Sequence, residues 1–101
     1  MNDRQEQIFN SVLKIVKDHL NPSHVILFGS RAKGKAQTSS SDFDFAIQGT
    51  KADHAVKRKV TDAIEKICGL YKVDIVYFDE VDEDFKNIIL KTGKVIYERG
   101  T

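Results

Sequence analysis

The chain has 101 residues, of which 41% are hydrophobic and 31% are charged, a composition typical of one soluble globular domain spanning residues 1–101. A formal net charge of +1 excludes strong overall attraction to nucleic acid or to an anionic membrane surface. Cys68 is the only cysteine, which excludes an intrachain disulfide; with neither a signal-peptide core nor an apolar stretch of transmembrane length, the sequence predicts a cytoplasmic protein.

The first half of the chain predicts a helix followed by two strands. Apolar residues recur at helical spacing over residues 3–20, and we expect this amphipathic helix to be ended by Pro22. The apolar run 24–28 has strand length, and residues 42–47 alternate with a period of two, which indicates a second strand. Residues 29–41 contain two glycines and four consecutive hydroxyl side chains, and they predict a turn, one or two helical turns and a polar loop.

The second half predicts a helix over residues 53–70, a strand over 72–78, a helix over 82–92 and a final strand over 94–98. Asp82 is expected to cap the last helix, and Gly93 lies where a C′ glycine ends one. This order indicates an α/β (α+β) fold with a four-stranded sheet flanked by helices. Since only a short loop joins the first two strands, they are expected to be antiparallel neighbours in a mixed sheet.

Two acidic residues interrupt the second strand. Phe43, Phe45 and Ile47 should share one face and pack in the core, which leaves Asp42 and Asp44 on the other face with Cα atoms about 6–7 Å apart. Two carboxylates so placed repel each other, and a divalent cation bound by oxygen atoms would relieve the repulsion. The simpler alternative is that these aspartates mark a strand end in a loop, because aspartate is unfavourable within strands.

The turn after the first strand has the features of a phosphate-binding loop. Gly29 permits close approach of a ligand, Ser30 supplies a donor, and a short helix starting near Ser30 would point free N–H groups at a phosphate. Arg31, Lys33 and Lys35 add three cations suited to a polyphosphate, although a solvated basic turn is the simpler alternative. Gly29 to Lys35 also fits most of a Walker A motif, but Ala36 follows where magnesium binding requires Ser or Thr.

A third acidic residue, Asp74, lies in the otherwise apolar strand at 72–78. An unpaired carboxylate buried there would be unfavourable, so Asp74 requires an exposed edge or a cation. Together with Asp42 and Asp44 it would complete a three-carboxylate site for one or two metal ions, and it would also be placed to accept a proton from an attacking hydroxyl.

These motifs resemble the minimal nucleotidyltransferases of the DNA polymerase β-like superfamily. The resemblance rests on the turn 29–34, on Asp42 and Asp44 two residues apart, and on Asp74 in a later strand, and it covers nearly the whole chain. In one departure, eleven residues separate Ser30 from Asp42, one more than in the common pattern, and the extra residue is expected within 37–41.

The resemblance implies that Asp42, Asp44 and Asp74 are catalytic and ligate Mg²⁺, with two ions possible, and that Gly29, Ser30 and Arg31 hold the triphosphate of ATP. It also implies a partner, because such proteins typically bind a small helical HEPN protein as the antitoxin of a toxin–antitoxin pair, in some cases by adenylylating a tyrosine. A hetero-oligomer and a homodimer both remain open, and the lack of a long apolar segment predicts no membrane association.

Three functions remain open from the sequence. The first is a Mg-dependent nucleotidyltransferase that adenylylates a partner protein. The second is a non-catalytic nucleotide-binding antitoxin that neutralises its partner by direct binding. The third is transfer to a small molecule such as an aminoglycoside, which is disfavoured because such enzymes usually carry an additional helical domain.

Overall fold

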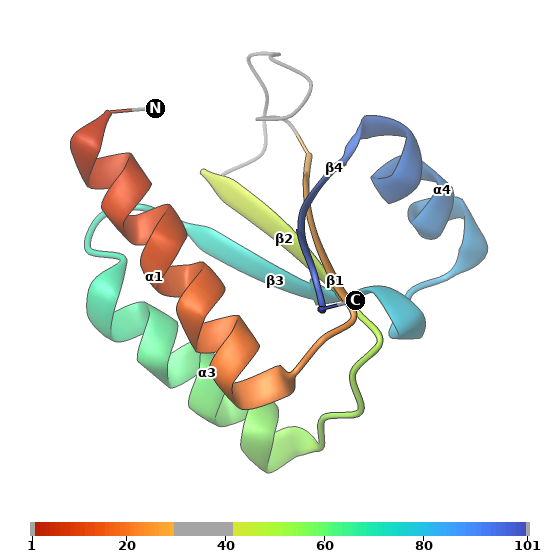
Figure 1. Ribbon diagram of the computed structural model, residues 1–101, viewed down its shortest axis with the longest axis horizontal. Coiled ribbons are helices and arrows are strands. Elements are labelled where there is room, and N and C mark those ends of the chain that lie inside the picture. Colours follow the sequence, from red (N-terminus) through yellow and green to blue (C-terminus); the bar gives the residue numbers. More distant parts are fainter. Residues whose placement is uncertain (1, 30–41, 101) are drawn as a thin grey trace.

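A computed structural model of the protein describes residues 2–29 and 42–100. In chain order the elements are α1 (Asp3–Leu20), β1 (His24–Phe28), β2 (Phe43–Gln48), α3 (His54–Ile67), β3 (Val73–Tyr77), the 3-10 helix η1 (Phe78–Glu80), α4 (Glu83–Thr92) and β4 (Lys94–Glu98). The strands form one four-stranded sheet in the order β3-β2-β1-β4. Helices α1 and α3 lie side by side on one face of the sheet, and α4 lies on the opposite face (Figure 1).

The sheet is mixed, as the sequence predicts. Strand β1 is antiparallel to both β2 and β4, whereas β2 and β3 are parallel. The parallel pair requires a long crossover, and helix α3 provides it. This connection sets the starts of β2 and β3 side by side at the end of the sheet where β1 finishes, which is the end that holds the predicted aspartates.

Helix α1 begins with a reciprocal capping box. The Asn2 side chain accepts a hydrogen bond from the Gln5 N–H, and the Gln5 side chain accepts one from the Asn2 N–H. The helix ends at Leu20, and Asn21 adopts a left-handed conformation with a φ of 45°. Asn21 therefore ends the helix one residue before the predicted stop at Pro22, because an αL residue already breaks the helical path.

Helix α3 is shorter than the predicted range of 53–70. Asp53 is its N-cap and accepts a hydrogen bond from the Val56 N–H at 3.0 Å, and the helix ends at Ile67. Gly69 has a φ of 59°, which turns the chain away from the helix axis. Leu70 follows this turn and is fully exposed, so it does not take part in the apolar face of the helix.

Replacing Asp53 by Ala is expected to lower the free energy of unfolding by about 1 kcal/mol, because the first turn of α3 loses the acceptor for its Val56 N–H. Urea denaturation followed by circular dichroism measures this change. Asp53→Asn is the matched control, since asparagine also accepts this hydrogen bond. If the alanine variant were as stable as the wild type, the cap would not contribute to stability.

The C-terminal half differs from the predictions at two places. Strand β3 ends at Tyr77, and the next three residues form η1, where the Asp79 carboxylate accepts a hydrogen bond from the Gly49 N–H at 2.8 Å. Asp82 caps α4 as predicted. Gly93 ends α4, but in an extended conformation with a φ of −92° rather than as a left-handed C′ residue. Glycine is needed there for space, because a Cβ atom would lie 2.5 Å from Ile26 Cγ2.

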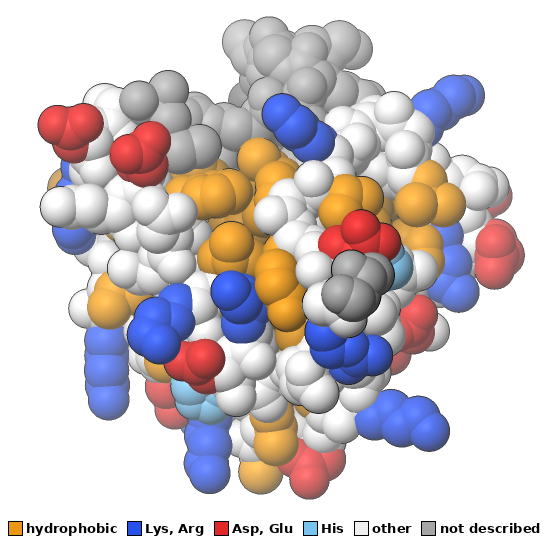
Figure 2. Space-filling view, in the orientation of Figure 1, with side chains coloured by type: hydrophobic (Ala, Val, Ile, Leu, Met, Phe, Trp, Pro, Cys, Tyr) orange, Lys and Arg blue, Asp and Glu red, His pale blue; other side chains and the backbone are white. Residues whose placement is uncertain are grey.

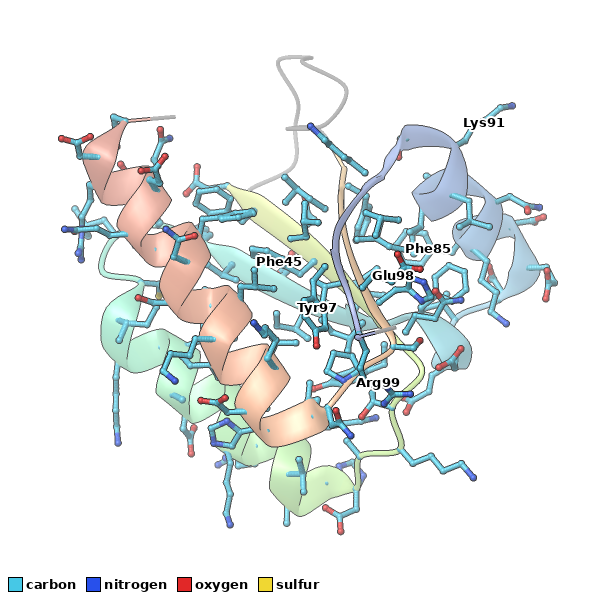
Figure 3. All side chains as sticks on the ribbon, viewed as in Figure 1. Phe45, Phe85, Lys91, Tyr97, Glu98 and Arg99 are labelled. Carbon is cyan, nitrogen blue, oxygen red and sulfur yellow. The ribbon has the colours of Figure 1, made fainter. Side chains whose placement is uncertain are left out.

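The sheet divides the core into two clusters. Phe43, Phe45 and Ile47 all point toward α1 and α3, as their alternation predicts, and each is completely buried. Figure 3 shows Phe45 between the sheet and α1, whereas Phe85 extends from α4 on the opposite side. Ala46 on the second face packs with Ile26 and the α4 residue Ile89. Asp44 also lies on this second face. The cluster beneath α1 and α3 therefore holds strand β2 in place, while the Asp44 carboxylate points away from that cluster.

Candidate active site

Asp44 and Asp74 lie directly opposite each other on the parallel strands β2 and β3. Neighbouring strands are about 4.8 Å apart, so the two side chains leave the backbone as close neighbours. Asp44 is 8% exposed and is the only buried charged or polar residue among those described, whereas Asp74 at the sheet edge is exposed. The pairing places one buried and one accessible carboxylate beside each other.

Gly29 follows β1 at the same end of the sheet. Its φ is 89°, a left-handed value that side-chain-bearing residues rarely adopt, and its strand neighbour Phe28 pairs with Asp44. A Cβ atom at position 29 would lie 3.0 Å from Asp44 Cγ and would overlap a carboxylate oxygen. Glycine therefore serves two purposes here, since it permits the turn and lets the Asp44 carboxylate lie against the backbone.

Replacing Gly29 by Ala is expected to lower the free energy of unfolding by about 1–3 kcal/mol, since alanine is strained at this φ and displaces the Asp44 side chain. Chemical denaturation measures the change. Gly100→Ala is the control, because nothing lies within 4 Å of a Cβ atom at that position. Equal stability of the two variants would show that the carboxylate does not rest on Gly29.

Asp42 lies one residue before β2 instead of inside the strand as predicted. Its carboxylate accepts a hydrogen bond from the Lys72 N–H at 2.9 Å, and its own N–H donates to the Lys72 carbonyl oxygen at 2.8 Å. These bonds fasten Asp42 to the residue that precedes β3. Asp42 is thus brought to the same end of the sheet as Asp44 and Asp74, with its carboxylate oriented toward the backbone of Lys72.

The donor set fits a hard divalent cation, because carboxylate oxygens are the ligands that Mg²⁺ prefers. The adjacent charges of Asp44 and Asp74 also favour a cation between them. Within residues 2–29 and 42–100, no three acidic, histidine or cysteine side chains are already gathered as a metal-binding group. The three aspartates thus lie at one end of the sheet but are not already gathered as a metal site among the described residues.

The predicted phosphate ligands Ser30 and Arg31 lie outside the described residues, as do Lys33, Lys35 and the loop 37–41 expected to hold the extra residue. Gly29 is the member of the predicted turn whose placement is described. On the face drawn in Figure 2, lysine and arginine side chains are spread among acidic and apolar ones instead of forming one basic patch.

The mixed sheet with its flanking helices is the fold of a nucleotidyl-transferring class of protein. A model of the family described as "Polymerase beta, Nucleotidyltransferase" matches residues 10–101, so the chain belongs to this nucleotidyltransferase family. The chain is also 32% identical over 91 residues to "Probable protein adenylyltransferase MntA" of Haemophilus influenzae, and the match covers 88% of this chain and 79% of that protein.

Two solved structures show the same fold. One, described as a toxin–antitoxin with AMP-PNP, has a TM-score of 0.68 and 22% sequence identity, covering 88% of this chain and 72% of the other. The second is a complex of a tri-AMPylated Shewanella oneidensis HEPN toxin with an MNT antitoxin, with a TM-score of 0.68, 18% identity and coverage of 93% and 72%. Among the described residues of the present chain, no helix is long and apolar enough to cross a membrane.

Sequence reasoning missed two contacts that shape the site. One is the role of the Lys72 backbone, which holds Asp42. The other is the close approach of Gly29 to Asp44, which follows from pairing of β1 with β2. Neither contact has a local signal in the sequence, because each joins residues that come together only when the sheet forms.

Proposed function

We propose that the protein is a Mg-dependent nucleotidyltransferase that transfers AMP from ATP to a hydroxyl group of a partner protein in the cytoplasm. The observation that carries the proposal is the pairing of Asp44 with Asp74 across two parallel strands, with the glycine turn directly against Asp44. This arrangement offers oxygen ligands for a cation beside the turn on which the triphosphate is expected to lie.

In the proposed reaction the acceptor oxygen attacks the α-phosphorus of ATP. A new P–O bond forms, the bond from this phosphorus to the bridging oxygen breaks, and pyrophosphate leaves. Bound Mg²⁺, one ion or two, would neutralise charge on the phosphates and the attacking oxygen. Asp42 and Asp44 would hold the ion with Asp74 as third ligand, and the accessible Asp74 carboxylate is also placed to accept the hydroxyl proton.

The triphosphate would lie on the turn formed by Gly29, Ser30 and Arg31. Gly29 permits the left-handed turn, while the Ser30 hydroxyl would donate a hydrogen bond and the Arg31 guanidinium would supply positive charge. Most of the catalytic effect would then come from positioning and from stabilisation of charge.

For the partner we propose a HEPN-type helical protein, with this chain acting as the antitoxin of a toxin–antitoxin pair. The support comes from the adenylyltransferase name of the Haemophilus relative and from the AMPylated HEPN toxin in the complex of the same fold. In the described part of the chain, the sheet and helices α1, α3 and α4 form the core and hold the aspartates.

The test is incubation of the protein with α-labelled ATP, Mg²⁺ and the HEPN-type protein encoded beside it, in comparison with the double variant Asp42→Asn/Asp44→Asn. We expect label on the partner with the wild type and none with the variant. Asp62→Asn, an exposed aspartate on α3, controls for loss of a negative charge. Suppression of the partner by a variant that transfers no label would instead establish a non-catalytic antitoxin that acts by binding.

A further inference from the structure

Strand β3 is an edge of the sheet whose outer side no described strand covers. The Phe43 N–H donates to the Lys72 carbonyl, and in a parallel ladder alternate residues face the neighbouring strand. Asp74 and Val76 accordingly direct their backbone groups toward β2. The N–H and C=O groups of Val73, Ile75 and Tyr77 point outward, where they can pair with one more strand.

A groove of about 340 Å³ runs along this edge. Strand β3 contributes Val73, Ile75 and Tyr77 to its lining, which are the residues with outward-pointing backbone groups. The other wall is formed by Thr61 and Glu65 of helix α3 and by its C-cap residue Cys68. Asp74 also lines the groove, so one residue of the candidate active site lies at this edge.

The charged residues that line the groove favour a positively charged occupant. Glu65 and Asp74 are its charged residues, and no lysine or arginine is found among the described residues that line it. Negative lining repels the phosphates of a nucleotide or a nucleic acid and attracts cationic side chains. Its opposite end is formed by Tyr77, whose pKa is raised by burial and by the nearby Glu80, so its hydroxyl remains a neutral donor at physiological pH.

An exposed apolar side chain lies next to the groove. Leu70 is 100% exposed and stands in the turn between Cys68, which lines the groove, and the start of β3. An exposed edge strand is also normally protected by charges, proline or a bulge, whereas Val73–Tyr77 has one charge and no proline. Both features indicate a surface that is covered when a partner binds.

We propose that the β3 edge binds the acceptor segment of the protein substrate as an added strand, with cationic residues of that segment beside Glu65 and its acceptor hydroxyl beside Asp74. The inference rests on the proposed transfer reaction. Backbone pairing would fix the position of the segment along β3, because a strand holds its residues in register with its neighbour. The hydroxyl would thereby be set beside the Asp74 carboxylate.

The experiment removes one outward hydrogen-bond donor while it keeps every side chain. The chain is assembled from residues 1–67 and a synthetic segment 68–101 joined at Cys68, its only cysteine, with the backbone nitrogen of Ile75 methylated. Transfer of AMP to the HEPN-type protein is measured against the unmethylated assembled chain. We expect kcat/KM for the partner to fall about tenfold or more, while binding of a fluorescent ATP analogue is unchanged.

A second pair of variants tests the same surface without backbone chemistry. Leu70→Ser should raise KM for the partner, whereas Leu90→Ser, at an exposed leucine on α4, should leave it unchanged. Glu65→Arg should likewise slow transfer, with Glu83→Arg on α4 as its control.

The outcomes separate the two proposals. If the unmethylated chain labels the partner and the methylated chain does so equally fast, the acceptor does not lie on β3, and the transferase proposal stands. If the unmethylated chain binds ATP but labels nothing, the transferase proposal fails and the acceptor groove fails with it. If light scattering shows a dimer that methylation dissociates, the edge pairs with a second copy of this chain, and the acceptor proposal is overturned.

Discussion

Replacing Asp44 by Asn is expected to lower the rate of nucleotide transfer by about 10²- to 10³-fold, the size of effect seen when one charge-stabilising group is removed from an active site. The asparagine side chain is nearly isosteric with aspartate but neutral, so a metal ion loses a negatively charged ligand. The same change should leave the free energy of unfolding largely unchanged, because asparagine keeps the size and shape of the buried Asp44 side chain against Gly29. Single-turnover transfer from labelled ATP and urea denaturation measure the two effects.

The contrast between a large loss of transfer and an unchanged stability makes the test specific. Asp62→Asn on α3 loses a charge of the same sign far from the strand pair and should change neither quantity appreciably. If Asp44→Asn lowered stability and activity together, Asp44 would be a structural residue of the sheet. Unchanged transfer with unchanged stability would remove Asp44 from the catalytic set.

Replacing Phe45 by Ala is expected to lower the free energy of unfolding by about 3–5 kcal/mol, a large part of the total of about 5–15 kcal/mol typical of a domain. Phe45 is completely buried, and its ring centroid lies 5.7 Å from that of Phe9 on α1 and 6.2 Å from that of Phe43. Its loss leaves a cavity between the sheet and α1, directly behind the strand that carries Asp44. Thermal unfolding followed by circular dichroism measures the loss.

The matched control is Phe85→Ala on α4. Phe85 is only half-buried and packs edge-on against Phe28 at 5.8 Å on the other face of the sheet, so its loss should be smaller. Equal losses at the two positions would mean that the α1–α3 side is not the principal core. If Phe45→Ala were stable, the cavity would have to be filled by movement of α1.

The sequence by itself predicted most of the fold. Period-two alternation at 42–47 and helical spacing at 3–20 identified elements that the structure confirms within one or two residues. These patterns are reliable because each arises from the burial of one face of the strand or helix. The short loop before β2 correctly predicted the antiparallel pair. Asp42 and Asp44 were predicted as cation ligands from the repulsion between two neighbouring carboxylates, and Asp74 from the cost of burying an unpaired carboxylate in an apolar strand.

The tertiary structure decided how these residues meet. Gly29 lies against Asp44, Asp42 is held by Lys72, and Asp44 pairs with Asp74, yet these partners are separated by 15 to 30 positions in the chain. The groove beside Asp74 likewise exists only because β3 is an edge strand with α3 above it. Periodicity records which face of an element is buried but not which element covers it, so strand order and parallel register had to come from the assembled sheet.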